Sequence, residues 1–229
     1  MNTTRRVRGG ERLPPPKEMR GFTLVELLSV LAILAILIGL LIPLLVTARR
    51  DARRVTCLSN LHQLGIAVGM YVHDADSLYP WAINPADAAH PERWEESPSF
   101  ESAIRRREVP QFHKALIAYV PGGALFRCPS DDGLRLSDPY PGWLLSAADS
   151  SFQSFGTSYF YRSVLAAQQV TESRLESTTT VVLFDAGGWW HGAREPDASA
   201  RSLRYNTLFA DLHAKNISQT DLAKNRPLP

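Results

Sequence analysis

The sequence predicts an α+β protein in which a long N-terminal helix, half membrane-spanning and half amphipathic, packs on an antiparallel β-sheet. An apolar run of membrane length occupies residues 22–46, and an apolar stripe at helical spacing continues from it to about His73. Segments with strand character follow only in the second half of the chain. The 229 residues are 45% hydrophobic and 21% charged, as in an ordinary globular domain, so the apolar run is a local feature.

The apolar run, FTLVELLSVLAILAILIGLLIPLLV, contains Glu26 as its only ionisable side chain. A helix rises about 1.5 Å per residue, so a run of this length is sufficient to cross a hydrocarbon core of roughly 30 Å. A secretory signal peptide cleaved near Val46-Thr47-Ala48 and an uncleaved signal anchor are alternative interpretations. The run is much longer than the apolar core of about 7–15 residues that a signal peptide needs.

Residues 1–21 carry six basic and two acidic side chains, a net charge of +4 in a chain whose total is +2. The remainder therefore carries −2, and its charge does not indicate a nucleic-acid partner. This leader contains three consecutive prolines and no apolar periodicity, so we expect it to be disordered and cytoplasmic.

The helix is expected to continue beyond the membrane. A basic collar of Arg49, Arg50, Arg53 and Arg54 follows the apolar run and is either a site for anionic headgroups or a plain solvated helix face. After it, apolar residues recur every three to four positions, at Val55, Leu58, Leu61, Leu64 or Gly65, Val68 and Tyr71. A helix from Phe22 to His73 would be about 80 Å long.

The second half of the chain predicts a small sheet. Its strand-like segments are Thr157–Val164, Thr178–Asp185 and Asn206–Ile217, the last being a hairpin that turns near Asp211. Gln111–Val120 predicts a short helix ended by Pro121-Gly122-Gly123. Ser77–Pro110 is rich in Pro, Asp, Ser and Glu without periodicity, which predicts a long surface segment.

The N-terminal motif resembles that of type IV prepilins and type II secretion pseudopilins. It comprises GFTLVE (residues 21–26), preceded by Lys17 and Arg20 and followed by an apolar helix with Pro43 near its end. The resemblance implies that a prepilin peptidase removes residues 1–21 by cleavage after Gly21 and methylates the new amine of Phe22. It also implies a single-pass inner-membrane protein whose residues 22–46 form the transmembrane and filament-core helix. Residues 47–229 would then form a periplasmic, pilin-like head.

The same resemblance assigns a role to Glu26. A carboxylate within a membrane helix costs roughly 2.5–3.5 kcal/mol near the centre and less near an end, so it persists where it has a partner or a function. In pilins that partner is the N-terminal amine of a neighbouring subunit, so other pilin or pseudopilin subunits are the expected partners. The alternative is a glutamate that extends to the headgroups one turn away.

Gly39 and Pro43 predict a kink in the apolar helix, because proline removes one backbone hydrogen bond and glycine loosens the preceding turn. In pilins this region resembles the segment that loses helicity when subunits pack. Alternatively, the proline is merely tolerated, as prolines often are in membrane helices.

The head has a second resemblance, to a large bacterial group of prepilin-like proteins. It is carried by Ala52–Pro80, by RCPSDD (Arg127–Asp132) and by TLFADLHAKNI (Thr207–Ile217). That group has a histidine about ten residues ahead of an Asp-Gly pair. Here Asp211 matches the aspartate, but Leu212 replaces the glycine and Arg201 stands where the histidine would be.

The two cysteines, Cys57 and Cys128, both fall in the part expected outside the cytoplasm. An oxidising compartment permits one disulfide that ties the long helix to the Cys-Pro-Ser-Asp loop, and two reduced, buried thiols are the alternative.

No motif indicates an enzyme, and no cofactor is expected. Asp185, His191, Asp211 and His213 match no metal-ligand spacing, and Asp131-Asp132-Gly133 resembles a calcium-binding turn only faintly. The main hypothesis is a structural subunit of a pilus or secretion pseudopilus. The alternative is a membrane-anchored binding module that uses the prepilin signal only for sorting, with GGWWHG (residues 187–192) as a ligand surface if its tryptophans are exposed.

Overall fold

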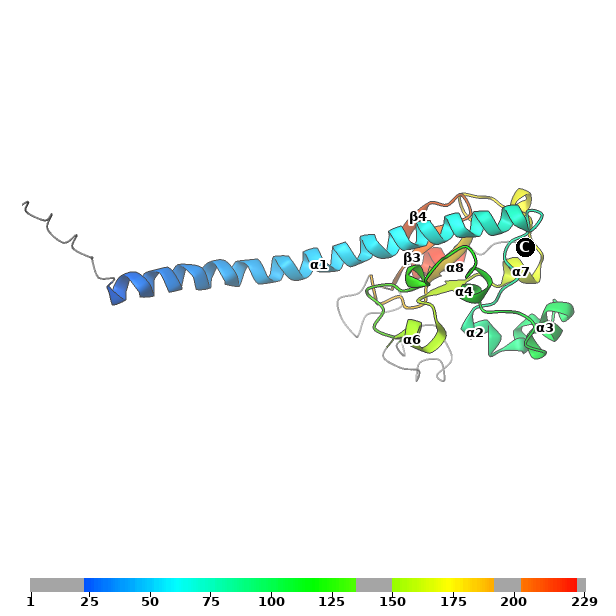
Figure 1. Cartoon of the computed structure of the whole chain (residues 1–229), viewed down its shortest axis with the longest axis horizontal. Helices are drawn as coiled ribbons and strands as arrows, with labels where there is room; N and C mark the ends of the chain where they lie inside the picture. Colours follow the sequence, from blue (N-terminus) through cyan, green and yellow to red (C-terminus); the bar gives the residue numbers. More distant parts are fainter. Residues whose placement is uncertain (1–22, 135–149, 192–202, 226–229) are drawn as a thin grey trace, which may run out of the picture. The chain divides into compact units, whose positions relative to one another are not determined.

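The computed structural model describes residues 23–134, 150–191 and 203–225. Packing divides the chain into two compact units, one ending at Val46 and the other beginning at Thr47. α1 (Leu24–Asp74) is a continuous helix that contributes residues to both units (Figure 1). Together with a four-stranded antiparallel sheet, it confirms the predicted α+β class.

In the first unit, every residue of α1 from Leu24 to Val46 is exposed. The mean hydropathy of the most apolar 18-residue window is 3.0, and within the described ranges α1 is the single helix long and apolar enough to cross a membrane. A helix that is apolar on all sides needs an apolar environment around it. This half of α1 therefore fits a membrane-anchored protein.

In the second unit, α1 buries one stripe consisting of Cys57, Leu61, Leu64, Gly65, Ala67, Val68 and Val72. The predicted stripe is confirmed at Leu61, at both alternatives Leu64 and Gly65, and at Val68, and its members Leu58 and Tyr71 are partly buried. It is wrong at its start, because Val55 is 61% exposed. Cys57, which the pattern omitted, is fully buried. The buried face of α1 therefore begins at Cys57.

The sheet has the order β1-β2-β3-β4 with every neighbouring pair antiparallel. Its strands are β1 (Tyr159–Tyr161), β2 (Val181–Asp185), β3 (Arg204–Phe209) and β4 (Ala214–Ser218). All fall inside the predicted strand segments except the first two residues of β3 and the last of β4, and the β3–β4 hairpin turns at residues 210–213, as expected.

Alternate residues of the strands face two cores. On one face Tyr159, Tyr161, Leu183 and Leu208 join the buried stripe of α1. On the other face Phe160, Phe184, Tyr205 and Ile217 pack with Leu222 of α8 (Gln219–Lys224). The sheet is thus a middle layer, which explains why β2 is buried at every residue.

The prediction of a surface segment from Ser77 to Pro110 is wrong. The segment contains α2 (Pro85–Ala88), the 3-10 helix η1 (Pro91–Trp94) and α3 (Pro98–Arg105). It also contributes buried side chains to the first core, among them Tyr79, Ile83, Phe100 and Ile104. Each of its three helices has proline in its first turn, a position where the missing N–H costs nothing, so these prolines start helices and do not mark an unstructured loop.

Among the described residues, five further short helices lie between these elements in the chain. The predicted helix Gln111–Val120 is reduced to α4 (Phe112–Ala115), followed by turns up to Pro121. The remainder are η2 (Ala124–Phe126), α6 (Ser151–Phe155), α7 (Val164–Ala167) and η3 (Glu172–Arg174).

α1 and the β3–β4 hairpin approach each other closely at Gly65. A Cβ atom at Gly65 would lie 2.9 Å from Cδ1 of Leu208 and 3.4 Å from Cδ2 of Leu212. Nearby, Nδ1 of His62 donates a hydrogen bond to the carbonyl oxygen of Leu212, at 2.9 Å. Gly65 therefore provides the space that lets the hairpin pack on the helix.

We predict that Gly65→Leu lowers the free energy of unfolding of the head by about 1–3 kcal/mol, because the new side chain overpacks a site already filled by Leu208. Gly69→Leu is the matched control, since no atom lies within 4 Å of its Cβ position. It should raise the free energy of unfolding by about 0.5–1 kcal/mol, because leucine favours a helix more than glycine does.

All five tryptophans lie beyond residue 80, so tryptophan fluorescence in a urea titration of the full chain in detergent reports on the head alone. Equal effects of the two substitutions would contradict the close approach at Gly65.

Candidate functional site

The first described residues form a hydrogen-bonded cap on α1. The backbone N–H and the hydroxyl of Thr23 both donate to Oε2 of Glu26, at 2.9 and 2.8 Å, respectively. In return the N–H of Glu26 donates to Oγ1 of Thr23, at 3.2 Å. This is a capping box, in which a threonine and a glutamate three residues later satisfy N–H groups that the first turn leaves unpaired.

The cap is a role for Glu26 that the sequence analysis missed, although the signal was present. The pattern Thr-x-x-Glu before an apolar run is a recognised start of a helix. Both hydrogen bonds from Thr23 use Oε2, and within the described part of the chain Oε1 accepts none. The carboxylate therefore keeps one oxygen available on an exposed side chain.

The structure describes two of the other residues predicted for the N-terminal site and leaves two undescribed. Gly21 and Phe22, the expected cleavage and methylation residues, lie outside the described residues. Gly39 and Pro43 lie within α1, which is helical on both sides of each residue, so neither one ends the helix. A loss of helicity on packing between subunits stays a prediction, since it concerns an assembled state.

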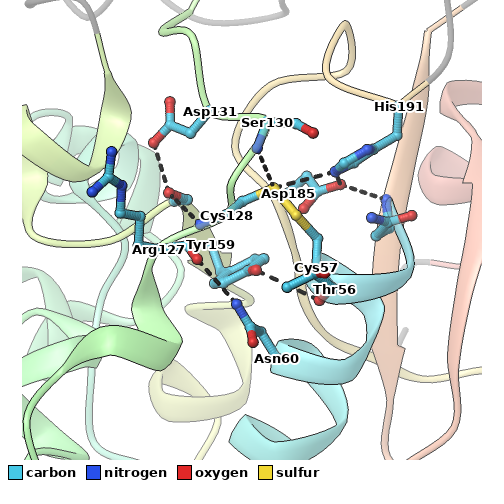
Figure 2. Close-up of a disulfide and its surroundings, with 12 residues drawn as sticks. Thr56, Cys57, Asn60, Arg127, Cys128, Ser130, Asp131, Tyr159, Asp185 and His191 are labelled. Carbon is cyan, nitrogen blue, oxygen red and sulfur yellow. Dashed lines mark hydrogen bonds and ion pairs between the residues drawn. A yellow bond between two sulfur atoms is a disulfide. The ribbon is translucent and has the colours of Figure 1, made fainter. Parts of the chain in front are cut away.

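The disulfide is confirmed. Cys57 of α1 and Cys128 of the loop after η2 are joined, and the alternative of two reduced thiols is wrong (Figure 2). The bond links positions 71 residues apart, and both cysteines are at most 1% exposed.

Two buried titratable groups lie beside the disulfide. Nε2 of His191 is 3.3 Å from Sγ of Cys128 and 3.6 Å from Oδ2 of Asp185, which also accepts the N–H of Asn206. Burial lowers the pKa of His191 to about 4, with a smaller effect from the nearby positive charge of Arg54. Burial also raises the pKa of Asp185 well above its usual value. Both shifts favour the uncharged forms, so the contact is not a strong ion pair.

The four residues considered as metal ligands separate into two pairs. Asp185 contacts His191 beside the disulfide, while Asp211 and His213 hydrogen bond within the β3–β4 turn. The ligand-type atoms of Cys57, Cys128 and His191 lie within 4.8 Å of one another. Metal ligation requires thiolates, however, and the disulfide consumes both sulfur atoms.

Asp131 of the Cys-Pro-Ser-Asp loop is engaged by protein donors. Its carboxylate accepts hydrogen bonds from five groups, the N–H groups of Gly133, Ser151 and Phe152 and the hydroxyls of Ser150 and Ser158. Oxygens that accept this many hydrogen bonds are not arranged as ligands for calcium. The aspartate instead anchors the loop to α6 and to the start of β1.

The tryptophan pair does not form an exposed surface. Trp189 is 7% exposed, and Trp190 is partly buried with its Nε1–H donating to the carbonyl oxygen of Gly133, at 3.0 Å. Gly192, the last residue of the motif, lies outside the described residues. A binding module was expected to expose these tryptophans, so their burial argues against that alternative.

Comparison with protein families assigns both parts of the chain. Residues 17–42 match the prokaryotic N-terminal methylation motif, and residues 46–187 match a family described as protein of unknown function (DUF1559). The chain belongs to the DUF1559 family. With its methylation motif, this DUF1559 protein is prepilin-like, as the sequence predicted. No curated protein and no solved structure matched the chain.

The structure explains one residue of the degenerate C-terminal motif. Leu212 has a φ of 70°, in the left-handed region that favours glycine, and it stands where the related group has the glycine of its Asp-Gly pair. A non-glycine residue there costs about 1–2 kcal/mol, and here its side chain lies beside Gly65 of α1. Arg201, which replaces the histidine, lies outside the described residues.

We predict that loss of the disulfide lowers the free energy of unfolding by roughly 4 kcal/mol, from the loop-closure entropy of a 71-residue separation. Reduced wild type and the double variant Cys57→Ser/Cys128→Ser should lose similar amounts in a urea titration followed by tryptophan fluorescence. Mass analysis after alkylation of unreduced protein should show no modified cysteine. Two alkylated thiols, or a stable reduced protein, would contradict this prediction.

Proposed function

We propose that this DUF1559 protein is a structural subunit, a minor pilin or pseudopilin, and has no catalytic activity. A prepilin peptidase cleaves after Gly21 and methylates Phe22, and the mature chain assembles through α1 into a pilus or a type II secretion pseudopilus. The observation that carries the proposal is the methylation motif at residues 17–42, which leads directly into an exposed apolar helix. Before assembly the chain would cross the inner membrane once, with a cytoplasmic leader and a periplasmic head.

The cap at Thr23 and Glu26 supports a role for the carboxylate in assembly. Within the described residues the carboxylate has no cationic partner, and Oε1 remains available. Cleavage after Gly21 would create an amine four residues before Glu26 in each subunit. A neighbouring amine then supplies the missing counter-charge, in surroundings where ion pairing is much stronger than in water.

The disulfide is consistent with this topology. Disulfides persist in oxidising compartments such as the periplasm and are rare in the cytosol. It supports a periplasmic location for the second unit.

We predict that Gly21→Val leaves the full 229-residue precursor in the membrane, because a bulky side chain before the scissile bond obstructs the peptidase. Gly10→Val, in the same leader but away from the bond, is the control and should be processed normally. N-terminal sequencing and mass analysis of the membrane fraction distinguish the outcomes. A wild-type N-terminus at Arg49 would instead support the signal-peptide interpretation.

We predict that the charge of Glu26, and not the cap, is needed for assembly. Glu26→Gln keeps an acceptor for Thr23, because glutamine also serves in a capping box, but it removes the charge. Thr23→Val removes the hydroxyl and weakens the cap by about 1 kcal/mol while it keeps the charge. Crosslinking between neighbouring helices should fail in Glu26→Gln and persist in Thr23→Val, with both proteins cleaved and inserted.

A photo-reactive residue in place of Leu34 provides the crosslink between helices. Glu26→Ala removes both the charge and the cap, so it gives the lowest crosslinking yield expected. The reverse pattern, with crosslinks lost in Thr23→Val and kept in Glu26→Gln, would show that the carboxylate serves only to cap α1 and would refute the pairing with an amine.

A further inference from the structure

A cavity of about 480 Å³ opens between α1 and the loop that contains Cys128. α1 contributes Arg53, Thr56 and Asn60, which are spaced by three and four residues and so share one face of the helix. The segment from η2 onward contributes Ala124, Arg127 and Pro129. The whole cavity lies within the second unit of the chain.

The disulfide and a hydrogen bond hold the two walls together. Cys57 follows Thr56 directly, and Cys128 lies between Arg127 and Pro129, so the bond joins residues adjacent to both walls. Nδ2 of Asn60 donates to the carbonyl oxygen of Arg127, at 3.0 Å. Figure 2 shows Thr56, Asn60 and Arg127 around the disulfide. The cavity is therefore built by two segments locked together covalently.

The lining is cationic and contains no acidic side chain. Neither Arg53 nor Arg127 forms a salt bridge to any described residue, and none of the six lining residues is acidic. The nearest carboxylate along the loop, Asp131, is held by five backbone N–H and hydroxyl donors, none of them from an arginine. Two guanidinium groups with hydroxyl and amide groups between them suit a phosphate ester, which guanidinium binds through paired N–H donors.

The position of the cavity in the chain indicates where such a phosphate would come from. Arg53 is seven residues beyond Val46, the last residue of the apolar run. Even a fully extended stretch of that length reaches only about 25 Å, so Arg53 stays near the membrane surface however the two units are arranged. Arg49 and Arg50, both exposed, lie closer still and add to the attraction for an anionic leaflet.

We infer that this cavity binds the phosphate of an anionic glycerophospholipid headgroup, with Arg53 and Arg127 as its two cationic contacts. Binding holds the head against the leaflet while the subunit is in the membrane. The inference does not depend on filament assembly, because it concerns the single chain.

The test measures lipid binding to the full-length, purified chain in neutral detergent by native mass spectrometry. Phosphatidylglycerol is compared with zwitterionic phosphatidylcholine, and glycerophosphoglycerol and inorganic phosphate are the water-soluble probes. We expect Arg53→Gln/Arg127→Gln to weaken phosphatidylglycerol binding by about 25-fold, from about fivefold for each arginine near a membrane surface. Arg53→Lys/Arg127→Lys keeps both charges but loses the paired N–H donors, so its affinity should lie between those of wild type and the glutamine variant, and its folding also shows that the site tolerates substitution.

Two further double variants serve as controls of equal charge. Arg107→Gln/Arg174→Gln removes two exposed arginines outside the cavity and should leave affinity within about twofold, since only cavity arginines contact the headgroup. Arg49→Gln/Arg50→Gln tests whether diffuse charge is sufficient.

Three outcomes would overturn the inference. One is an equal loss in the Arg49/Arg50 and Arg53/Arg127 variants, which would indicate a non-specific basic collar. Another is equal binding of phosphatidylglycerol and phosphatidylcholine. The third is binding of inorganic phosphate or glycerophosphoglycerol as tight as that of the lipid, which would assign the cavity to a soluble phosphate ester.

Discussion

The covalent bond between Cys57 and Cys128 is the constraint on which the rest of the head depends. Cys57 is the first residue of α1 that is buried, so the disulfide marks the position at which the helix begins to pack on protein. From there the buried stripe continues through Leu61, Leu64, Val68 and Val72, on the face of the helix that carries Cys57. Before Cys57 the described residues of α1 are exposed, apart from the half-buried Arg54, so the packing of the helix on the head begins at the disulfide.

The disulfide joins α1 to the Cys128 loop at one position, and Asp131 connects that loop to the sheet. Its carboxylate joins the Cys128 loop to the first turn of α6 and, through Ser158, to the residue just before β1. Ser158 also accepts the N–H of Cys128 on its hydroxyl, at 3.0 Å. One disulfide and a few buried or partly buried hydrogen bonds thus connect Cys57 of α1 to the start of β1. Such bonds strengthen where water is excluded.

The sequence predicted those parts of the fold that depend on local periodicity. The long helix, three strand-bearing segments and the hairpin turn near Asp211 follow from spacing alone. It failed where tertiary packing decides, as at Val55, which has the right spacing but faces solvent because Cys57 sets the buried face. Ser77–Pro110 was misjudged because short helices have too few turns to show a period, although its side chains fill the first core. At the N-terminus the resemblance assigned Glu26 a role in assembly, which stays a prediction, and the sequence analysis missed the hydrogen bonds between Glu26 and Thr23. The cavity at Arg53 could not be predicted, because it depends on a contact between segments far apart in the chain.

The cap at the start of α1 leaves one question about Glu26, namely why this residue is charged. Glutamine would serve the capping box equally well, so the hydrogen bonds with Thr23 do not require a carboxylate. A negative charge near the first turn also gains about 0.3–1 kcal/mol from the helix dipole. In a membrane helix a carboxylate costs up to roughly 2.5–3.5 kcal/mol, less near an end, so the dipole alone offsets only part of that cost. The proposed assembly gives this charge a reason, because the amine that cleavage before Phe22 would create in a neighbouring subunit would be a cationic partner for it.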